Sequence, residues 1–108
     1  MTDESKDSLS SKQKKFLKGI GHHLNSLIYI GKEGLSDSLI EATKKELKQH
    51  ELIKVKIGKN SPIDKKSTAE ALPLQADCQL VQLIGKTLLL YKANPKRKPD
   101  ERIRLPKN

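Results

Sequence analysis

Cysteine and aromatic residues are scarce in this chain of 108 residues. Cys78 is the only cysteine, so no intrachain disulfide can form and no cluster of thiolates can hold a zinc ion. Aromatic residues make up 3% of the chain and tryptophan is missing. This scarcity argues against a sheet that stacks nucleobases on paired aromatic side chains, as RNA-recognition motifs do.

Long hydrophobic runs are also missing. No apolar stretch approaches the roughly 20 residues that a helix needs to cross a bilayer, and the polar, acidic residues 1–7 do not resemble a signal peptide. We therefore expect a cytoplasmic protein that is not inserted in a membrane.

Positive charge, in contrast, is abundant. The chain has 22 Lys and Arg residues against 13 Asp and Glu, a net charge of +9, and a pI near 9.7. An excess of this size favours association with polyanions, which include nucleic acids and anionic membrane surfaces. The length predicts one domain with a modest core.

A glycine-bounded loop is the first candidate site. A strand at residues 27–30 runs into Gly31, Lys32, Glu33 and Gly34, the GxxG loop, and Ser36 is a good N-cap for a helix that begins directly afterwards. Glycines allow a tight turn and a close approach to a ligand. The N–H groups at the helix start and the Lys32 ammonium suit a phosphate. By itself a GxxG is a weak signal, because most such pairs only permit a turn.

The first predicted helix is the second candidate. Ser10 and Gln13 form the S-x-x-Q signature of a capping box. Helical periodicity assigns the apolar face to Phe16, Leu17, Ile20 and Leu24. The opposite side, the lysine face, consists of Lys12, Lys14, Lys15, Lys18 and His22. No acidic residue lies between residues 12 and 23 to neutralise this charge. Because the helix, the first strand and the GxxG loop follow one another in the chain, we expect the lysine face and the loop to border one groove.

The remaining elements follow from periodicity and turn residues. The strand at 53–57 alternates apolar residues with Lys54 and Lys56, which add further positive charge. A third helix is predicted to start at Ser61–Pro62 and to kink or end near Pro73. Strands at 79–84 and 87–91 flank Gly85-Lys86, which fits a two-residue type II′ turn. The run of leucines at 88–90 predicts a strand covered on both faces.

Both chain ends are predicted to be polar. Residues 1–8 have the composition of a disordered arm, residues 9–93 form the domain, and residues 94–108 form a basic tail with the composition of a mobile segment. Ile103 and Leu105 are apolar enough to dock part of that tail.

Catalytic and metal-binding patterns do not emerge from the sequence. His22 and His23 are adjacent and therefore do not face each other on a helix. His50 stands alone, and no carboxylate at ligand spacing completes a site. No nucleophile–base pair is visible. We therefore expect no bound metal, no cofactor and no catalytic residue.

Taken together, the motifs resemble those of a known family. Residues 11–19, 22–24, 30–35, 51–56, 80–91 and 104–106 are similar, in order, to segments of the YhbY-type RNA-binding proteins, the single-domain bacterial members of the CRM (chloroplast RNA splicing and ribosome maturation) family. The resemblance implies an α/β (α+β) fold, a two-layer α–β–α–β–α–β–β domain with a four-stranded mixed sheet. This fold is related to the C-terminal domain of translation initiation factor three.

The resemblance also implies a function. Members of the family bind structured RNA, and the bacterial proteins associate with precursors of the large ribosomal subunit. The GxxG loop is expected to meet the RNA backbone, which assigns that role to Gly31, Lys32 and Gly34. Two departures from the family pattern are Glu33, an acid within the loop, and Pro73, which interrupts the third helix.

We therefore predict a monomeric, non-enzymatic protein that binds large-subunit ribosomal RNA or a pre-ribosomal particle. Two alternatives remain open at this point: a protein-binding adaptor for an acidic assembly or translation factor, and an RNA-processing enzyme. The predicted RNA-binding residues are Gly31, Lys32, Gly34, Lys12, Lys14, Lys15, Lys18, His22, Lys54 and Lys56.

Overall fold

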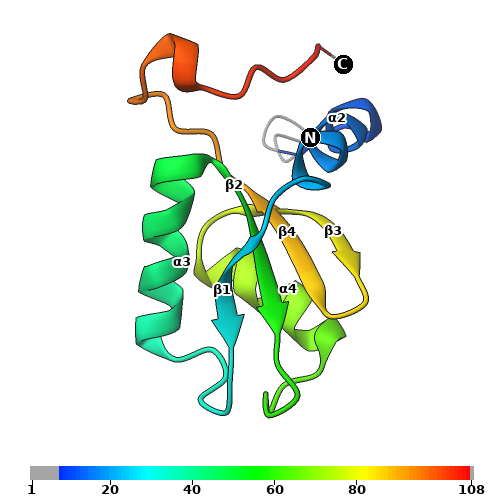
Figure 1. The fold of residues 1–108 in the computed structure, drawn as a ribbon, viewed down its shortest axis with the longest axis vertical. Helices are drawn as coiled ribbons and strands as arrows, with labels where there is room; N and C mark the ends of the chain where they lie inside the picture. The colour runs from blue at the N-terminus through cyan, green and yellow to red at the C-terminus, as the bar shows by residue number, and fades with distance from the viewer. Residues whose placement is uncertain (1–7, 108) are drawn as a thin grey trace, which may run out of the picture.

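Helices and strands follow the predicted order α–β–α–β–α–β–β along the chain (Figure 1). The computed structural model describes residues 8–107, so the predicted N-terminal arm lies outside the described residues except for Ser8. In chain order the elements are α2 (Ser11–Gly21), β1 (Ser26–Ile30), α3 (Asp37–His50), β2 (Leu52–Ile57), α4 (Lys65–Gln75), β3 (Gln79–Ile84), β4 (Thr87–Tyr91) and the 3₁₀ helix η1 (Pro99–Glu101).

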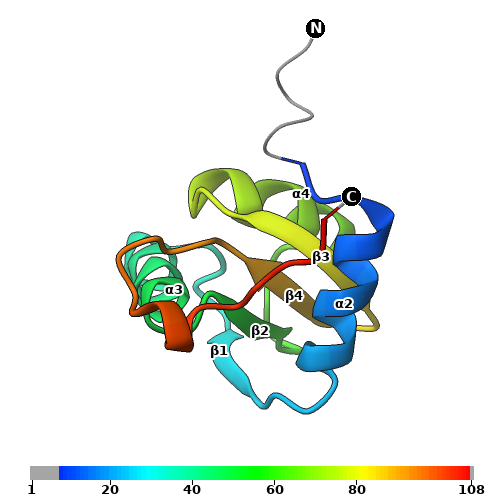
Figure 2. The ribbon, with the colours of Figure 1, turned by 90° about the horizontal axis from the view of Figure 1, so that it is seen from above.

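The four strands form one mixed sheet in the order β1-β2-β4-β3. β1 pairs with β2 in parallel, whereas β2 with β4 and β3 with β4 are antiparallel. α3 and α4 cover one face of the sheet, and α2 lies on the opposite face (Figure 2). The α+β class with a mixed sheet is confirmed, and α2 adds a partial third layer to the predicted two.

Strand β4 is buried on both of its faces, as the leucine run predicted. Leu88 and Leu90 belong to the core under α3 and α4, while Leu89 belongs to the cluster under α2. Alternate side chains of a strand point to opposite faces, so a strand covered on both sides must be apolar throughout.

The N-terminal caps form where the sequence places them. The Ser10 hydroxyl accepts a hydrogen bond from the Gln13 N–H, and the Gln13 side chain accepts one from the Ser10 N–H, which completes the capping box. The Ser36 hydroxyl accepts from the Leu39 N–H at the start of α3.

The apolar face assigned to the first helix is partly wrong. Leu17 is fully buried, but Phe16 is 40% exposed. α2 contacts the sheet through Leu17 and Gly21, and a Cβ at Gly21 would come within 2.7 Å of a Leu89 methyl carbon. Because α2 packs on the sheet most closely at Leu17 and Gly21, Phe16 lies at the edge of this contact.

The third helix begins later than predicted and does not end at Pro73. α4 starts at Lys65 behind an Asp64 N-cap, whose carboxylate accepts from the Ser67 N–H, and not at Ser61–Pro62. Pro73 lies inside the helix, which continues to Gln75. Proline removes one donor and crowds the carbonyl four residues before it, but this close to the end of the helix the disturbance does not terminate it.

The β3–β4 hairpin has the predicted turn. Ile84 pairs with Thr87, which leaves Gly85 and Lys86 as a two-residue loop. Gly85 has φ of +57° and Lys86 is not among the residues with positive φ, the pattern that a type II′ turn requires.

The C-terminal segment is anchored to the domain, in contrast to the mobile tail that its composition predicts. The buried Glu51 carboxylate accepts hydrogen bonds from the N–H groups of Asn94 (2.7 Å) and Ile103 (2.8 Å). Ile103 and Leu105 pack against the cluster under α2, as expected. Hydrogen bonds to one distant carboxylate therefore position this segment. The local sequence gives no sign of them.

Candidate nucleic-acid interface

The GxxG loop is a tight turn that joins the edge strand β1 to α3. The Gly34 N–H donates to the Gly31 carbonyl at 3.0 Å, which closes the turn. Gly34 has φ of +63°, and a Cβ at this position would lie 3.2 Å from Pro62 Cγ. A Cβ at Gly31 would meet no atom within 4 Å, and the φ of Gly31 is not in the left-handed region. The fold therefore requires glycine at position 34 but does not require it at 31.

The tip of the loop carries no net charge, because the exposed Lys32 is followed by the exposed Glu33. Beside it lies a hollow of about 490 Å³, lined by the loop, by Leu27 and Tyr29 of β1, and by the first turns of α3. Since Ser36 and Asp37 already complement the N-terminus of α3, the loop offers backbone groups and shape more than positive charge.

The lysine face of α2 lies on the surface. Its side chains are exposed except for Lys14, which is half-buried. The chain has no Asp or Glu between Ser8 and Lys32, so no acid within this stretch compensates these charges.

The end of α2 and strand β2 together line a second hollow, of about 210 Å³. Lys18, His22 and Lys54 border it, and Gly21 and Leu89 contribute to its lining. Lys56 lies two residues beyond Lys54 on the same face of β2. The structure thus brings together Lys18, His22 and Lys54, which are far apart in the sequence.

The single groove expected between the lysine face and the GxxG loop does not form. The two hollows share no lining residue. α2 contacts β2 and β3, whereas the loop follows β1 at the opposite edge of the sheet (Figure 1). Lys18 and His22 of α2 thus lie beside Lys54 of β2, whereas the GxxG loop borders a separate hollow.

Tyr29 also lies on this face, although no motif in the sequence singles it out. Its side chain is 62% exposed and pairs in register with Lys56. A Cβ at Gly58 would overlap the Tyr29 hydroxyl, so the tyrosine side chain occupies the space above this glycine. The only signal in the sequence is a glycine directly after the strand at 53–57.

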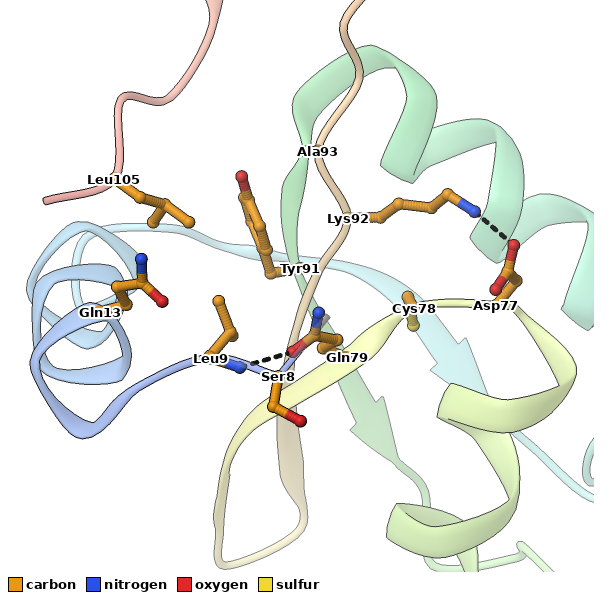
Figure 3. Close-up of a pocket in the computed structure, with 10 residues that line it drawn as sticks. All are labelled: Ser8, Leu9, Gln13, Asp77, Cys78, Gln79, Tyr91, Lys92, Ala93 and Leu105. Atoms are coloured by element: carbon orange, nitrogen blue, oxygen red, sulfur yellow. Dashed lines mark hydrogen bonds and ion pairs between the residues drawn. The ribbon is translucent and has the colours of Figure 1, made fainter. Parts of the chain in front are cut away.

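The largest hollow among those described, of about 680 Å³, lies elsewhere, near the start of α2 and the C-terminal segment (Figure 3). Cys78 and Tyr91 line it, together with the Asp77–Lys92 ion pair. Burial raises the pKa of the Cys78 thiol to about 12, so at neutral pH this group is a protonated thiol and a poor nucleophile. Burial also raises the pKa of Tyr91, and the nearby Glu51 carboxylate adds to the effect.

Neither a metal site nor a membrane span is found among residues 8–107. Within this range no group of three or more His, Cys, Asp or Glu side chains is arranged to hold a metal ion. None of the helices in the same range combines the length and apolarity that crossing a membrane requires.

Known proteins resemble this chain over most of its length. The family model of the CRS1 / YhbY (CRM) domain matches residues 9–92. A Bacillus subtilis (strain 168) protein named "Probable RNA-binding protein YqeI" is 42% identical over 98 residues, covering 91% of this chain and 99% of that protein. A Haemophilus influenzae protein named "RNA-binding protein" is 37% identical over 100 residues, covering 93% and 97% respectively.

A solved structure shows the same fold. The solution structure of the hypothetical protein SAV1595 from Staphylococcus aureus matches with a TM-score of 0.73 and 34% identity, covering 92% of this chain and all of that one. Sequence and structure therefore agree with the resemblance found in the motifs: the chain belongs to the CRS1 / YhbY (CRM) domain family.

Proposed function

We propose that this protein binds structured ribosomal RNA during assembly of the large ribosomal subunit, as a cytoplasmic monomer without a cofactor or catalytic activity. One observation carries the proposal: Lys18 and His22 of α2 border one hollow with Lys54 of β2, and Lys56 lies on the same face of that strand. Relatives that match nearly the whole chain are named RNA-binding proteins, and the motif resemblance supplies the link to the large subunit.

The two parts of the interface have different roles in this proposal. Lys14, Lys18 and Lys54 attract phosphates and account for most of the salt-dependent affinity. The GxxG loop carries no net charge, so it contributes backbone N–H groups and the close approach that the open space at Gly31 allows. Contacts to the RNA backbone do not read bases, so RNA shape determines which sites are bound.

The dependence of RNA affinity on salt tests this proposal. Replacing Lys14 and Lys18 with Ala should lower the slope of log affinity against log salt by about 0.7–0.9 for each phosphate that is no longer neutralised. The matched control replaces Lys45 and Lys48 with Ala. These lysines lie on α3, on the opposite side of the sheet, and their replacement removes the same amount of charge. The control should keep the wild-type slope. Equal slopes for both variants would contradict the assignment to the lysine face.

Sedimentation of cell extracts tests whether the binding partner is RNA or protein. The protein should travel with particles that contain large-subunit RNA and should leave them after nuclease treatment. If it stays bound to a protein after the RNA is destroyed, it is an adaptor. Turnover of ribosomal RNA by the purified protein, with or without magnesium, would identify an RNA-processing enzyme instead.

A further inference from the structure

Tyr29 is the most exposed aromatic side chain of the protein, at 62%, against 40% for Phe16 and 4% for Tyr91. It lies on β1, where Ile28 and Ile30 point into the core under α3 and α4. Alternation along the strand therefore directs Tyr29 to the face that carries Lys54 and Lys56. A tyrosine of this exposure must have a large part of its ring available for contact.

The hydroxyl end of the ring lies against a neighbouring backbone segment. Gly58 follows β2, and a Cβ there would overlap the Tyr29 hydroxyl and lie 2.8 Å from its Cε2 atom. The Gly58 N–H donates to the Ile30 carbonyl at 2.8 Å, which ties this segment to the end of β1. The missing side chain at position 58 thus lets the tyrosine lie close over backbone.

A single exposed tyrosine needs no special explanation. The residues around Tyr29 are what indicate a binding role. Lys56 is its register partner on β2, and Lys32 follows three residues later in the GxxG loop. The Tyr29 side chain is 62% exposed, and the ammonium groups of both lysines attract phosphates. An exposed planar surface on the same part of the molecule as cations suits a nucleotide, since its base stacks while its phosphates are neutralised.

We infer that Tyr29 is a stacking platform for one unpaired base of the bound RNA, with Lys32 and Lys56 at the adjacent phosphates. This inference rests on the proposed RNA binding and defines its substrate class. The faces of paired bases are covered by their neighbours in a duplex, so the preferred RNA carries an unstacked nucleotide in a loop or bulge.

Tyrosine fluorescence provides a direct probe, because the protein has no tryptophan and only two tyrosines, one of which, Tyr91, is buried. The experiment compares a short RNA duplex that carries an adenosine bulge with the same duplex without it. The bulged RNA should quench the emission of the wild-type protein, and the plain duplex should not. In Tyr29→Phe, which keeps the ring but removes this emitter, the quenching should disappear while the affinity remains.

Affinity separates stacking from simple attraction. Tyr29→Leu keeps an apolar group over Gly58 but removes the aromatic face, so it should weaken binding to the bulged RNA about five- to fifty-fold, with an unchanged salt slope. Thermal melts of the two variants check that the fold is retained.

The outcomes also distinguish the two proposals. If Tyr29→Leu binds both RNAs as the wild type does, while the Lys14 and Lys18 replacement lowers the salt slope, the stacking inference is wrong and RNA binding stands. If the wild-type protein binds neither RNA, both the stacking inference and the proposed RNA binding are wrong.

Discussion

At the scale of single residues, the two glycines of the GxxG loop are not equivalent. Gly34 is buried, has a positive φ and lies against Pro62, so folding alone accounts for its lack of a side chain. Gly31 has open space and an ordinary φ. The absence of a side chain at position 31 therefore leaves the loop open to a ligand that comes close.

We therefore expect opposite results from two alanine substitutions. Gly34→Ala should lower the free energy of unfolding by about 1–2 kcal/mol, because alanine is strained at positive φ. Gly31→Ala should leave stability unchanged or slightly higher and should weaken RNA binding. Urea unfolding and RNA titration of both variants measure the two effects. Unchanged RNA binding in Gly31→Ala would mean that no backbone approaches the loop closely.

At the scale of elements, the C-terminal segment depends on one carboxylate. Glu51 is fully buried, has φ of +65°, and lies between Arg97 and Arg102. Non-glycine residues rarely adopt this φ, and a buried carboxylate is costly unless it is paired and hydrogen-bonded. The backbone N–H groups of Asn94 and Ile103 supply those hydrogen bonds, so the segment and its anchor stabilise each other.

Replacing Glu51 with Gln should therefore lower the free energy of unfolding by about 2–4 kcal/mol. An amide has one acceptor oxygen instead of two, so either the Asn94 or the Ile103 N–H would lose its partner. Denaturant titration measures the loss. Glu101→Gln, an exposed site on the same segment, removes the same charge and should change stability by less than about 0.5 kcal/mol. Equal effects would show that Glu51 does not anchor the segment.

At the scale of the whole molecule, the positive charge acts on folding and binding in opposite directions. The net charge of +9 attracts a polyanion, but the same charges repel one another in the folded state. Two of the arginines are placed at Glu51, whereas the lysine face has no acid within its own stretch of chain. Added salt should therefore weaken RNA binding and stabilise the free protein.

Thermal unfolding at increasing sodium chloride concentration tests whether salt stabilises the free protein. Screening of the self-repulsion should raise Tm by about 2–4 °C between low and physiological ionic strength, equivalent to about 0.5 kcal/mol. Calorimetry or circular dichroism measures it. The Lys45 and Lys48 variant, which has a smaller net charge, should show a smaller rise. A Tm that falls with salt would mean that ion pairs outweigh repulsion.

Local interactions explain the parts of the fold that were predictable. The capping box at Ser10, the Ser36 cap, the hairpin at Gly85 and the doubly buried leucines of β4 depend on residues within a few positions of one another. The basic candidates were predictable too, because charge is read directly from composition.

The order of the elements, their caps and turns, the family resemblance and the basic character of α2 thus follow from the sequence. Three features depend on the three-dimensional arrangement: Lys18 and His22 lie at a hollow separate from the one beside the GxxG loop, Glu51 anchors a segment more than forty residues away, and Tyr29 lies over Gly58. The cause is the range of the interactions. Caps and turns form between neighbours in the chain, whereas these three features depend on how separate elements pack together.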